Sequence, residues 1–201
     1  STSGGSMSAF MQTKFNDNSA YAAYSSQNVA DFASGSVAEG EKSSLLAREV
    51  SGAGALESGK YDIVFELPAL HSMISEILLP SFGGDSLVQK TSLLSGKAGK
   101  QEFSPDFSLY DDPSDNRGFF SPFDGEGVSQ PKKPLVKGGI VSGFLLDSRT
   151  ACLLGGKGAL GEIGNCSRSS FQSMPGCGES TLVVEMPGKD ASLPDGGHLE
   201  V

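Results

Sequence analysis

The stretch Asp115–Gly155, DNRGFFSPFDGEGVSQPKKPLVKGGIVSGFLLDSRTACLLG, holds the densest turn signals and the clearest strand pattern in the chain. The pair Asp124-Gly125 favours a tight turn, because glycine readily adopts the positive φ that such turns require. Lys137-Gly138-Gly139 supplies similar positions between two apolar pairs, Leu135-Val136 and Ile140-Val141. We therefore expect a β-hairpin whose turn lies at the two glycines, with the rest of the chain packed around it.

The two arms of this hairpin should differ. Pro131 and Pro134 lack the N–H group that a central strand donates, so we expect the first arm to be an edge strand or an irregular one. The second arm carries apolar residues that suit a buried strand, namely Ile140, Val141, Phe144, Leu145 and Leu146. A further strong strand is predicted at Thr181–Met186.

Composition favours an α+β fold dominated by mixed and antiparallel strands. Only 37% of the 201 residues are hydrophobic, while 27 glycines and 10 prolines indicate many turns. No apolar run approaches the roughly 18 residues of a membrane span, so we expect a soluble protein without membrane contact. The net charge of -9 would repel phosphate backbones, which argues against direct binding of nucleic acid.

The three cysteines, Cys152, Cys166 and Cys177, are an odd number without C-x-x-C spacing. This pattern suggests neither a disulfide framework nor a zinc knuckle, so we expect reduced thiols in a cytoplasmic protein and leave the role of each cysteine open. The acidic residues Asp111 and Asp112, with Asp115 nearby, could bind a cation, but solvated carboxylates are the simpler interpretation because no EF-hand-type loop surrounds them.

The first part of the chain carries weaker signals. Ala9–Ala38 is compatible with one or two strands, and Ser43–Val50 with a short helix. Glycines then punctuate the sequence, and we place a domain boundary near Gly59. Residues 1–58 would be the tail of an N-terminal domain or a linker, and residues 59–201 a second domain.

One short amphipathic helix is predicted after a strand at Tyr61–Leu67. Pro68 suits its first turn, and Pro80 should end it. Between them a set of apolar residues recurs with the spacing of one buried helical stripe: Leu70, Met73, Ile74, Ile77 and Leu78.

Several segments together resemble the C-terminal domain of the TldD/PmbA (TldE) family. The resemblance covers roughly Gly59 to Pro187 in order. Its motifs are Phe123–Val128, Pro134–Val136, Gly138-Gly139, Gly143-Phe144, Asp147–Ala151, Gly164–Ser170 and Pro187-Gly188. The resemblance implies zinc metallopeptidase complexes, in which a catalytic TldD-type subunit pairs with a PmbA/TldE-type subunit to act on peptides and unstructured polypeptides. Older labels call members modulators of DNA gyrase, which for so acidic a chain implies an indirect effect.

The same resemblance places the family's zinc motif on the predicted helix. TldD-type members carry His-Glu-x-x-x-His there, where two imidazoles hold the metal and the Glu acts as general base on the bound water. An ungapped comparison puts Ser75, Glu76 and Pro80 at the first His, the Glu and the last His. Glu76 therefore occupies the catalytic position without ligands beside it, so no metal is expected in this chain and zinc is expected in a TldD-type partner.

We therefore expect a TldE-like, non-catalytic subunit with the 59–201 domain truncated relative to the family. It would bind peptides and assemble with a TldD-type subunit or with itself. Arg149 and Arg168 are candidate substrate-binding residues, although Arg149 could equally form an ion pair that orders the end of the hairpin. Two alternatives stay open: a metallopeptidase with an unrecognised metal site, and a stand-alone β-rich peptide-binding protein.

Overall fold

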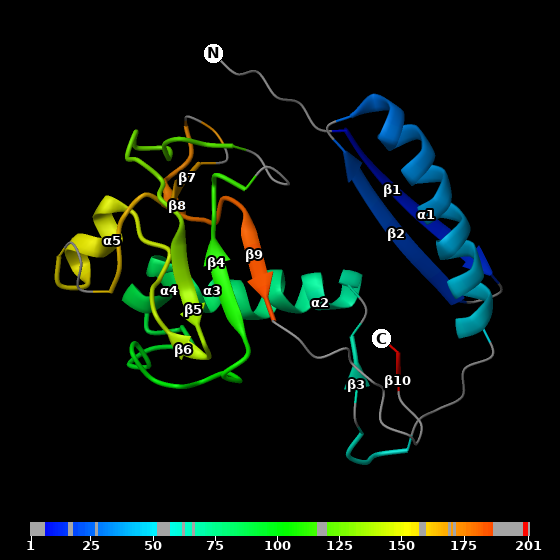
Figure 1. Ribbon diagram of the computed structural model, residues 1–201, viewed down its shortest axis with the longest axis horizontal. Coiled ribbons are helices and arrows are strands. Elements are labelled where there is room, and N and C mark those ends of the chain that lie inside the picture. The colour runs from blue at the N-terminus through cyan, green and yellow to red at the C-terminus, as the bar shows by residue number, and fades with distance from the viewer. Residues whose placement is uncertain are drawn as a thin grey trace. The chain divides into compact units, whose positions relative to one another are not determined.

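The protein is described here from a computed structural model, which covers residues 7–15, 18–26, 28–51, 57–61, 63–65, 67–115, 120–156, 160–168, 170, 172–186 and 199–200. Its contacts divide the chain into two compact units, Ser1–Lys60 and Tyr61–Val201. Figure 1 shows the elements of both units, and each unit is considered by itself.

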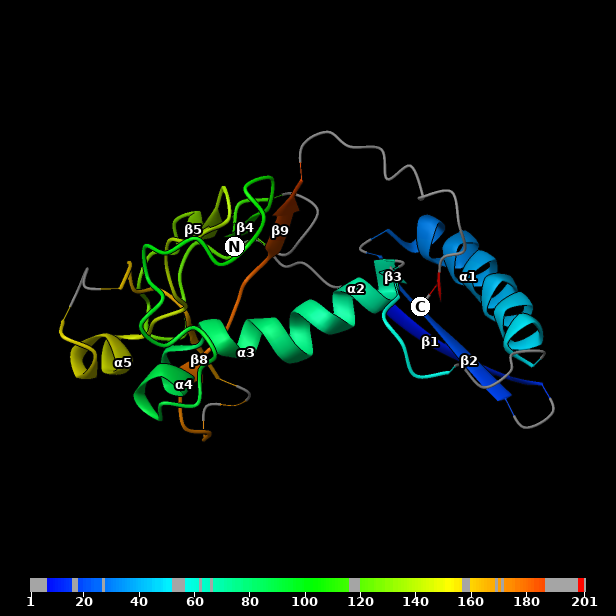
Figure 2. The same cartoon turned by 90° about the horizontal axis from the view of Figure 1, so that it is seen from below.

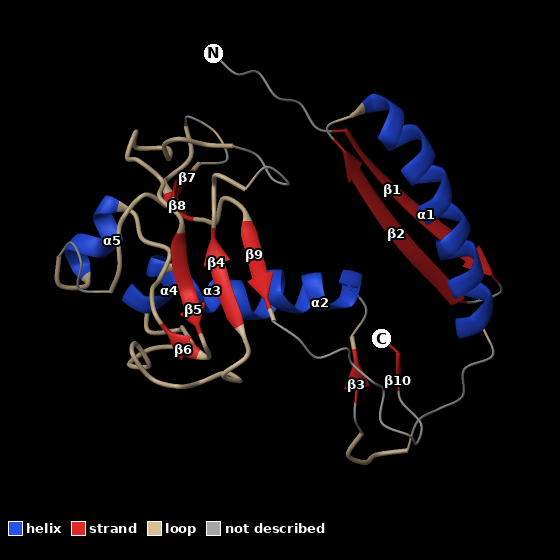
Figure 3. Ribbon diagram, in the orientation of Figure 1, coloured by secondary structure: helices blue, strands red, loops and turns tan. Residues whose placement is uncertain are grey.

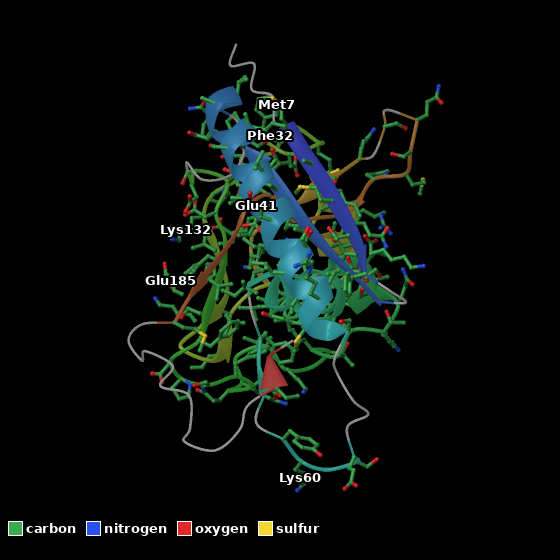
Figure 4. The ribbon with its side chains drawn as sticks, turned by 90° about the vertical axis from the view of Figure 1, so that its right-hand side faces the viewer. Met7, Phe32, Glu41, Lys60, Lys132 and Glu185 are labelled. Atoms are coloured by element: carbon green, nitrogen blue, oxygen red, sulfur yellow. The ribbon has the colours of Figure 1, made fainter. Side chains whose placement is uncertain are left out.

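The first unit is a β-hairpin with a long helix on one of its faces (Figure 1). Strands β1 (Met7–Phe15) and β2 (Asn18–Ser26) pair antiparallel without a register shift, and α1 (Val29–Val50) follows. The side chain of Asn28 caps α1 by accepting the Ala30 N–H at 2.9 Å. Figure 4 shows Phe32 and Glu41 along this helix and Met7 at the start of β1. On the exposed face of the hairpin the rings of Phe10 and Tyr21 stack, with centroids 5.9 Å apart.

Helix α1 corrects the expectation for the N-terminal region. The two strands are present, but residues 29–38 are helical, and the predicted helix at Ser43–Val50 is only the end of a 22-residue element. Its small residues allow close packing: a Cβ atom on Gly35 would lie 2.2 Å from the Tyr24 ring. Ser43 is buried and its Oγ lies 2.9 Å from Thr13 Oγ1 of the hairpin. The small residues of α1 made the helix hard to predict from the sequence. The same residues allow the helix to pack closely against the two strands.

The second unit contains a four-stranded antiparallel sheet in the order β6-β5-β4-β9. Its strands are β4 (Ser108–Asp111), β5 (Lys133–Lys137), β6 (Ile140–Val141) and β9 (Leu182–Glu185). A continuous helical stretch lies across one face of this sheet (Figure 2). It comprises α2 (Leu67–Met73), the π-helical turn η1 (Ile74–Leu78) and α3 (Leu79–Phe82).

Smaller elements complete this unit (Figure 3). They are α4 (Gly84–Val88), α5 (Ser148–Leu153), the antiparallel pair β7 (Cys166–Ser167) and β8 (Gly176–Cys177), and the parallel pair β3 (Ile63–Val64) and β10 (Leu199–Glu200). The core forms between the sheet and the helices. Its most deeply buried apolar residues are Phe82, Leu109, Leu135, Val136, Val141, Leu145 and Leu146.

The α+β class is confirmed, as are the hairpin turn at Gly138-Gly139 and the strand at Thr181–Met186, whose ladder covers Leu182–Glu185. The expectation of a buried strand for the second arm is wrong, because β6 comprises only Ile140–Val141 and lies at the edge of the sheet. The expectation of an edge position for the first arm is wrong, because β5 lies between β6 and β4. Pro134 is tolerated there because β6 pairs only with Val136 and Lys137, so no β6 residue is paired with Pro134. The expected irregularity is present as a register shift where β4 meets β5.

The predicted helix is present, but its boundaries and its buried face differ from the expectation. The preceding strand is limited to Ile63–Val64 among the described residues, with Asp62 and Glu66 lying outside them. The helical stretch continues to Phe82 because Pro80 lies in the first turn of α3, just after the π turn, where the regular hydrogen-bond ladder is already interrupted. Met73 and Ile77 are 40% and 60% exposed, so the buried-stripe assignment is wrong for these two residues.

Candidate functional site

The π turn η1 brings together Ser75 and Pro80, the two residues that we expected at the family's zinc-ligand positions. The N–H of Leu79 donates to the carbonyl of Ile74, an i→i+5 bond that widens the turn. In a regular α-helix residues five apart point in different directions, whereas a wide turn moves them towards one face. Ser75 and Pro80 accordingly line the same cavity. A wide turn of this kind suits a His-Glu-x-x-x-His motif, whose histidines are five residues apart.

This cavity has a volume of about 330 Å³ and lies where the helical stretch meets the loop after β8. Its lining combines small polar, apolar and acidic side chains: Ser75, Leu79, Pro80, Gly83, Asp85, Ser86, Leu145, Cys177 and Glu179. Glu76 is exposed and is not among these residues. His71 is also exposed, and its Nε2 lies 3.5 Å from Ser75 Oγ one turn further along.

Ser75 and Pro80 do not offer the ligands that a zinc ion requires. Proline has no side-chain donor, and a serine hydroxyl does not replace an imidazole as a ligand for Zn²⁺. Within the described ranges, no group of three or more His, Cys, Asp or Glu side chains could hold a metal ion. The two positions at which we expected the family's histidines therefore supply no zinc ligand.

Asp85 connects three segments beside the cavity. Its Oδ1 accepts a charged hydrogen bond from Arg149 Nη2 on α5, and its Oδ2 accepts the N–H of Cys177 on β8 at 2.9 Å. The bond to Asp85 raises the pKa of the Arg149 guanidinium above its usual value. Arg149 thus forms the ion pair that the sequence analysis weighed against a substrate-binding role.

The segment Asp147–Thr150 forms the start of helix α5. The Asp147 carboxylate accepts the N–H and the hydroxyl of Thr150, each at 2.6 Å, and Thr150 Oγ1 accepts the Asp147 N–H. This reciprocal pattern is a capping box, which satisfies the free N–H groups of α5. Ser148 donates its N–H to Glu126 Oε2 at 3.0 Å. The structure places Arg168 elsewhere, exposed directly after β7.

A buried polar network was not foreseen from the sequence. Lys133 Nζ donates to Asn165 Oδ1 and to the carbonyl of Ile163, and Asn165 Nδ2 donates to Asp111 Oδ2 at 2.6 Å. The other oxygen of Asp111 accepts from the N–H and hydroxyl of Ser180. Burial lowers the pKa of Lys133, and the nearby carboxylates only partly oppose this effect. Lysines stand at both ends of β5, Lys133 and Lys137, so the sequence alone did not indicate which of them is buried.

The acidic run around Asp112 is not simply solvated, so that interpretation was wrong for two of its residues. Asp111 is fully buried in the network above, and Asp112 is nearly buried. Hydrogen bonds from Ser114 lower the pKa of Asp112, and Lys132 lies 3.3 Å from the same carboxylate. Figure 4 shows Lys132 close to Glu185 on the outside of the sheet, and their Nζ and Oε1 atoms are 3.9 Å apart.

With this geometry in place, comparison with known proteins defines the class: the second unit is the C-terminal domain of a metallopeptidase family. The family model for the PmbA/TldA metallopeptidase C-terminal domain matches residues 58–195. The chain belongs to the TldD/PmbA family.

Individual relatives agree with this assignment. An uncharacterized protein of Methanocaldococcus jannaschii is 30% identical over 66% of this chain and 31% of its own length. A metalloprotease PmbA homolog of Buchnera aphidicola is 27% identical over 79% of this chain and 37% of its own length. The crystal structure of TldE from Thermococcus kodakarensis covers 90% of this chain and 40% of its own, with a TM-score of 0.72. At 23% identity this likeness shows the fold alone. The match spans between 18% and 37% of the length of four curated relatives.

Proposed function

We propose that this chain is the non-catalytic, TldE-like subunit of a TldD/PmbA-type metallopeptidase complex that acts on peptides or unstructured polypeptides. The observation that carries the proposal is the pairing of Ser75 and Pro80 on one cavity wall through the π turn. The backbone geometry suits the family motif, but both side chains lack the chemistry of a zinc ligand. The zinc would belong to a TldD-type partner.

The position of Glu76 also supports a non-catalytic role for this chain. A general base of this type acts on a metal-bound water, whose pKa the metal lowers to near neutrality. Without two ligands on its own helix, Glu76 has no such water to activate, and it is exposed beside the cavity rather than directed into it. The proposed role of this chain is therefore to complete a substrate-binding surface.

The sheet offers a means of binding extended peptides. Among the described strands β9 pairs only with β4, and Val184 and Met186 are exposed on it or directly after it. A peptide can add a strand to such an edge, gaining affinity from main-chain hydrogen bonds with little demand on its sequence. Arg149 and Arg168 remain the proposed contacts for substrate carbonyl or carboxylate groups. Proteolytic activity against unstructured chains would fit this unspecific recognition.

The test is metal analysis and peptide cleavage with the purified chain, alone and mixed with a TldD-type subunit. We expect less than one zinc per chain and no chelator-sensitive cleavage by this chain alone. Cleavage should appear with the TldD-type subunit and be abolished by a chelator. One zinc per chain together with chelator-sensitive cleavage by this chain alone would contradict the proposal and favour an unrecognised metal site. Peptide binding without any effect on the TldD-type subunit would favour a stand-alone binding protein.

A further inference from the structure

Cys166 and Cys177 lie directly opposite each other on β7 and β8, which run side by side in Figure 1. Their backbone groups do not bond to one another. Cys166 donates its N–H to Asp124 Oδ2 and accepts the N–H of Gly125, while Cys177 donates its N–H to Asp85 Oδ2. The neighbouring rung is closed by the bond from Gly178 N–H to the Asn165 carbonyl at 2.9 Å. The cysteines therefore form a non-hydrogen-bonded antiparallel pair.

This type of pair has the spacing that a disulfide requires. Opposite residues at non-hydrogen-bonded positions have Cα atoms about 4.5 Å apart and side chains on the same face of the ladder. Disulfides span Cα separations of roughly 4.4–6.8 Å. The backbone can thus accept a bond between the two sulfur atoms, with a change of side-chain rotamer, without moving the strands apart.

The two thiols are free and differ in access. Cys166 is buried, whereas Cys177 is half-buried, lines the cavity, and has its Sγ 3.3 Å from Thr150 Oγ1. Burial raises the pKa of both thiols, which keeps them protonated near neutral pH and makes their reactions slow. The third cysteine, Cys152, is exposed on α5 and provides an internal control.

We propose that Cys166 and Cys177 are a modification site at which a low-molecular-weight disulfide of the glutathione type forms a reversible cross-strand disulfide. The more accessible Cys177 loses its proton and attacks one sulfur of the reagent, which gives a mixed disulfide and one thiolate. The Cys166 thiolate then attacks the Cys177 sulfur of the mixed disulfide and expels the second thiolate. The two cysteines lose two electrons in total, the reagent gains them, and the two protons pass to the two released thiols.

Formation of this bond would change the cavity wall. Cys177 Sγ would leave Thr150 for Cys166, while the Cys177 N–H holds Asp85 and through it Arg149. Oxidation would therefore fix β8 against β7 and alter one side of the cavity. This inference does not rest on the proposed function, because it concerns only the register of two strands.

The experiment incubates the folded full chain in buffers of reduced and oxidised glutathione, at mildly alkaline pH to speed the exchange. Remaining thiols are then alkylated, and intact mass and peptide mapping are measured. We expect the loss of two hydrogens and a peptide linked through Cys166 and Cys177, both reversed by excess reduced glutathione. Cys152→Ser should behave like the parent chain. Cys166→Ala and Cys177→Ala should each give no intramolecular link.

Two controls keep the outcome decisive. A sample in concentrated urea shows which pairings form without the fold, and the native sample should favour the Cys166–Cys177 link over that distribution. Circular dichroism confirms that each variant remains folded. A link that involves Cys152, a glutathione adduct as the only product, or three fully alkylated cysteines under strongly oxidising buffer would each overturn the proposal.

Discussion

At the scale of single residues, Asp85 carries two interactions of different strength. Its ion pair with Arg149 joins side chains that are 31% and 43% exposed, so solvent screens the attraction. Its bond with the N–H of Cys177 satisfies a half-buried backbone donor. A donor of this kind that loses its partner costs more than a lost surface charge pair.

We therefore predict that Arg149→Ala lowers the free energy of unfolding by no more than about 1 kcal/mol. Asp85→Ala should cost about 1–3 kcal/mol, because the Cys177 N–H loses its acceptor. Asp85→Asn is the matched control, since the amide oxygen can still accept that bond. Urea unfolding curves measure all three changes, and equal losses for Arg149→Ala and Asp85→Ala would show that the ion pair dominates.

Lys133 should make stability depend on alkaline pH. Burial lowers its pKa in the folded chain, so above that pKa the unfolded chain binds more protons than the folded chain. The contribution of Lys133 to stability should therefore grow as pH rises from its folded pKa towards the unfolded value of about 10.4.

Cys166 and Cys177 have the opposite effect on the free energy of unfolding. Their thiol pKa values are raised in the folded chain, so the unfolded chain loses these protons first and stability falls as pH rises. For this reason the quantity to measure is the difference in unfolding free energy between the parent chain and Lys133→Met across a pH series. We expect this difference to move in favour of the parent chain as pH rises. A difference that moves the other way would mean that Lys133 is more basic in the folded chain.

At the scale of elements, the success of prediction from sequence depended on local turn chemistry. The β5–β6 turn was predictable because Gly138 and Gly139 both adopt positive φ, 55° and 77°. Helix α1 was not predictable, because its serines and glycines are weak helix formers. Packing against the hairpin, which the sequence pattern does not reveal, stabilises this helix. The apolar stripe was placed with a constant α-helical period, whereas the π turn shifts the later residues, so that Phe82 rather than Ile77 reaches the core.

The site was predictable only in part, for the same reason. The structure places Ser75 and Pro80 on one cavity. Their correspondence to the family's two histidine positions stays a prediction. The contacts of Asp85 with Cys177 and of Lys133 with Asn165 join residues far apart in the chain, and no periodicity indicates such pairs. The expectations for Glu76 and for substrate binding by Arg149 and Arg168 stay predictions.

The corrected helix face leads to a clear contrast between two substitutions. Phe82→Ala should destabilise the chain by about 3–5 kcal/mol, because it removes a ring that is fully buried beside Phe144. Ile77→Ala should cost less than about 1 kcal/mol, since this side chain is 60% exposed. Thermal or urea unfolding compares the stability of the two variants. A large loss of stability in Ile77→Ala would show that Ile77 is buried, as the sequence pattern predicted.

The π turn also predicts that a metal-ligand pair can be rebuilt. In the double variant Ser75→His with Pro80→His, both imidazoles should project into one cavity, as Ser75 and Pro80 now do. We expect this variant to bind Zn²⁺ at least tenfold more tightly than Ser75→His alone, because two ligands act on one ion. Equilibrium dialysis with a colorimetric zinc indicator measures the affinity. If the double variant and Ser75→His bind Zn²⁺ with equal affinity, the side chains at positions 75 and 80 do not reach the same ion.

At the scale of the whole molecule, the chain contains two units and exposes strand edges in the described parts of both. No helix in the described part of the chain is both long enough and apolar enough to cross a membrane. The assignment of residues 1–58 to an N-terminal tail or linker, and of 59–201 to a truncated C-terminal domain, stays a prediction. So does the cytoplasmic location.

Assembly is the prediction that belongs to this scale. Exposed edges of soluble proteins are usually covered, and this chain exposes Val184 and Met186 at β9 as well as Phe10 and Tyr21 on its hairpin. We expect a dimer or larger assembly, with itself or with a TldD-type subunit, that buries more than about 1,000 Å². Light scattering at micromolar concentration provides the measurement. A chain that is monomeric, and stays monomeric when the TldD-type subunit is added, would contradict the predicted assembly.

The order of elements in the two units also has a consequence for how quickly each unit folds. In the first unit β1, β2 and α1 follow one another directly and contact one another. In the second, β4 must find β9, which follows it only after β5, β6, α5, β7 and β8. Chains rich in local contacts fold faster than those that must close long loops. During synthesis the hairpin and its helix would thus be formed before β9 has left the ribosome.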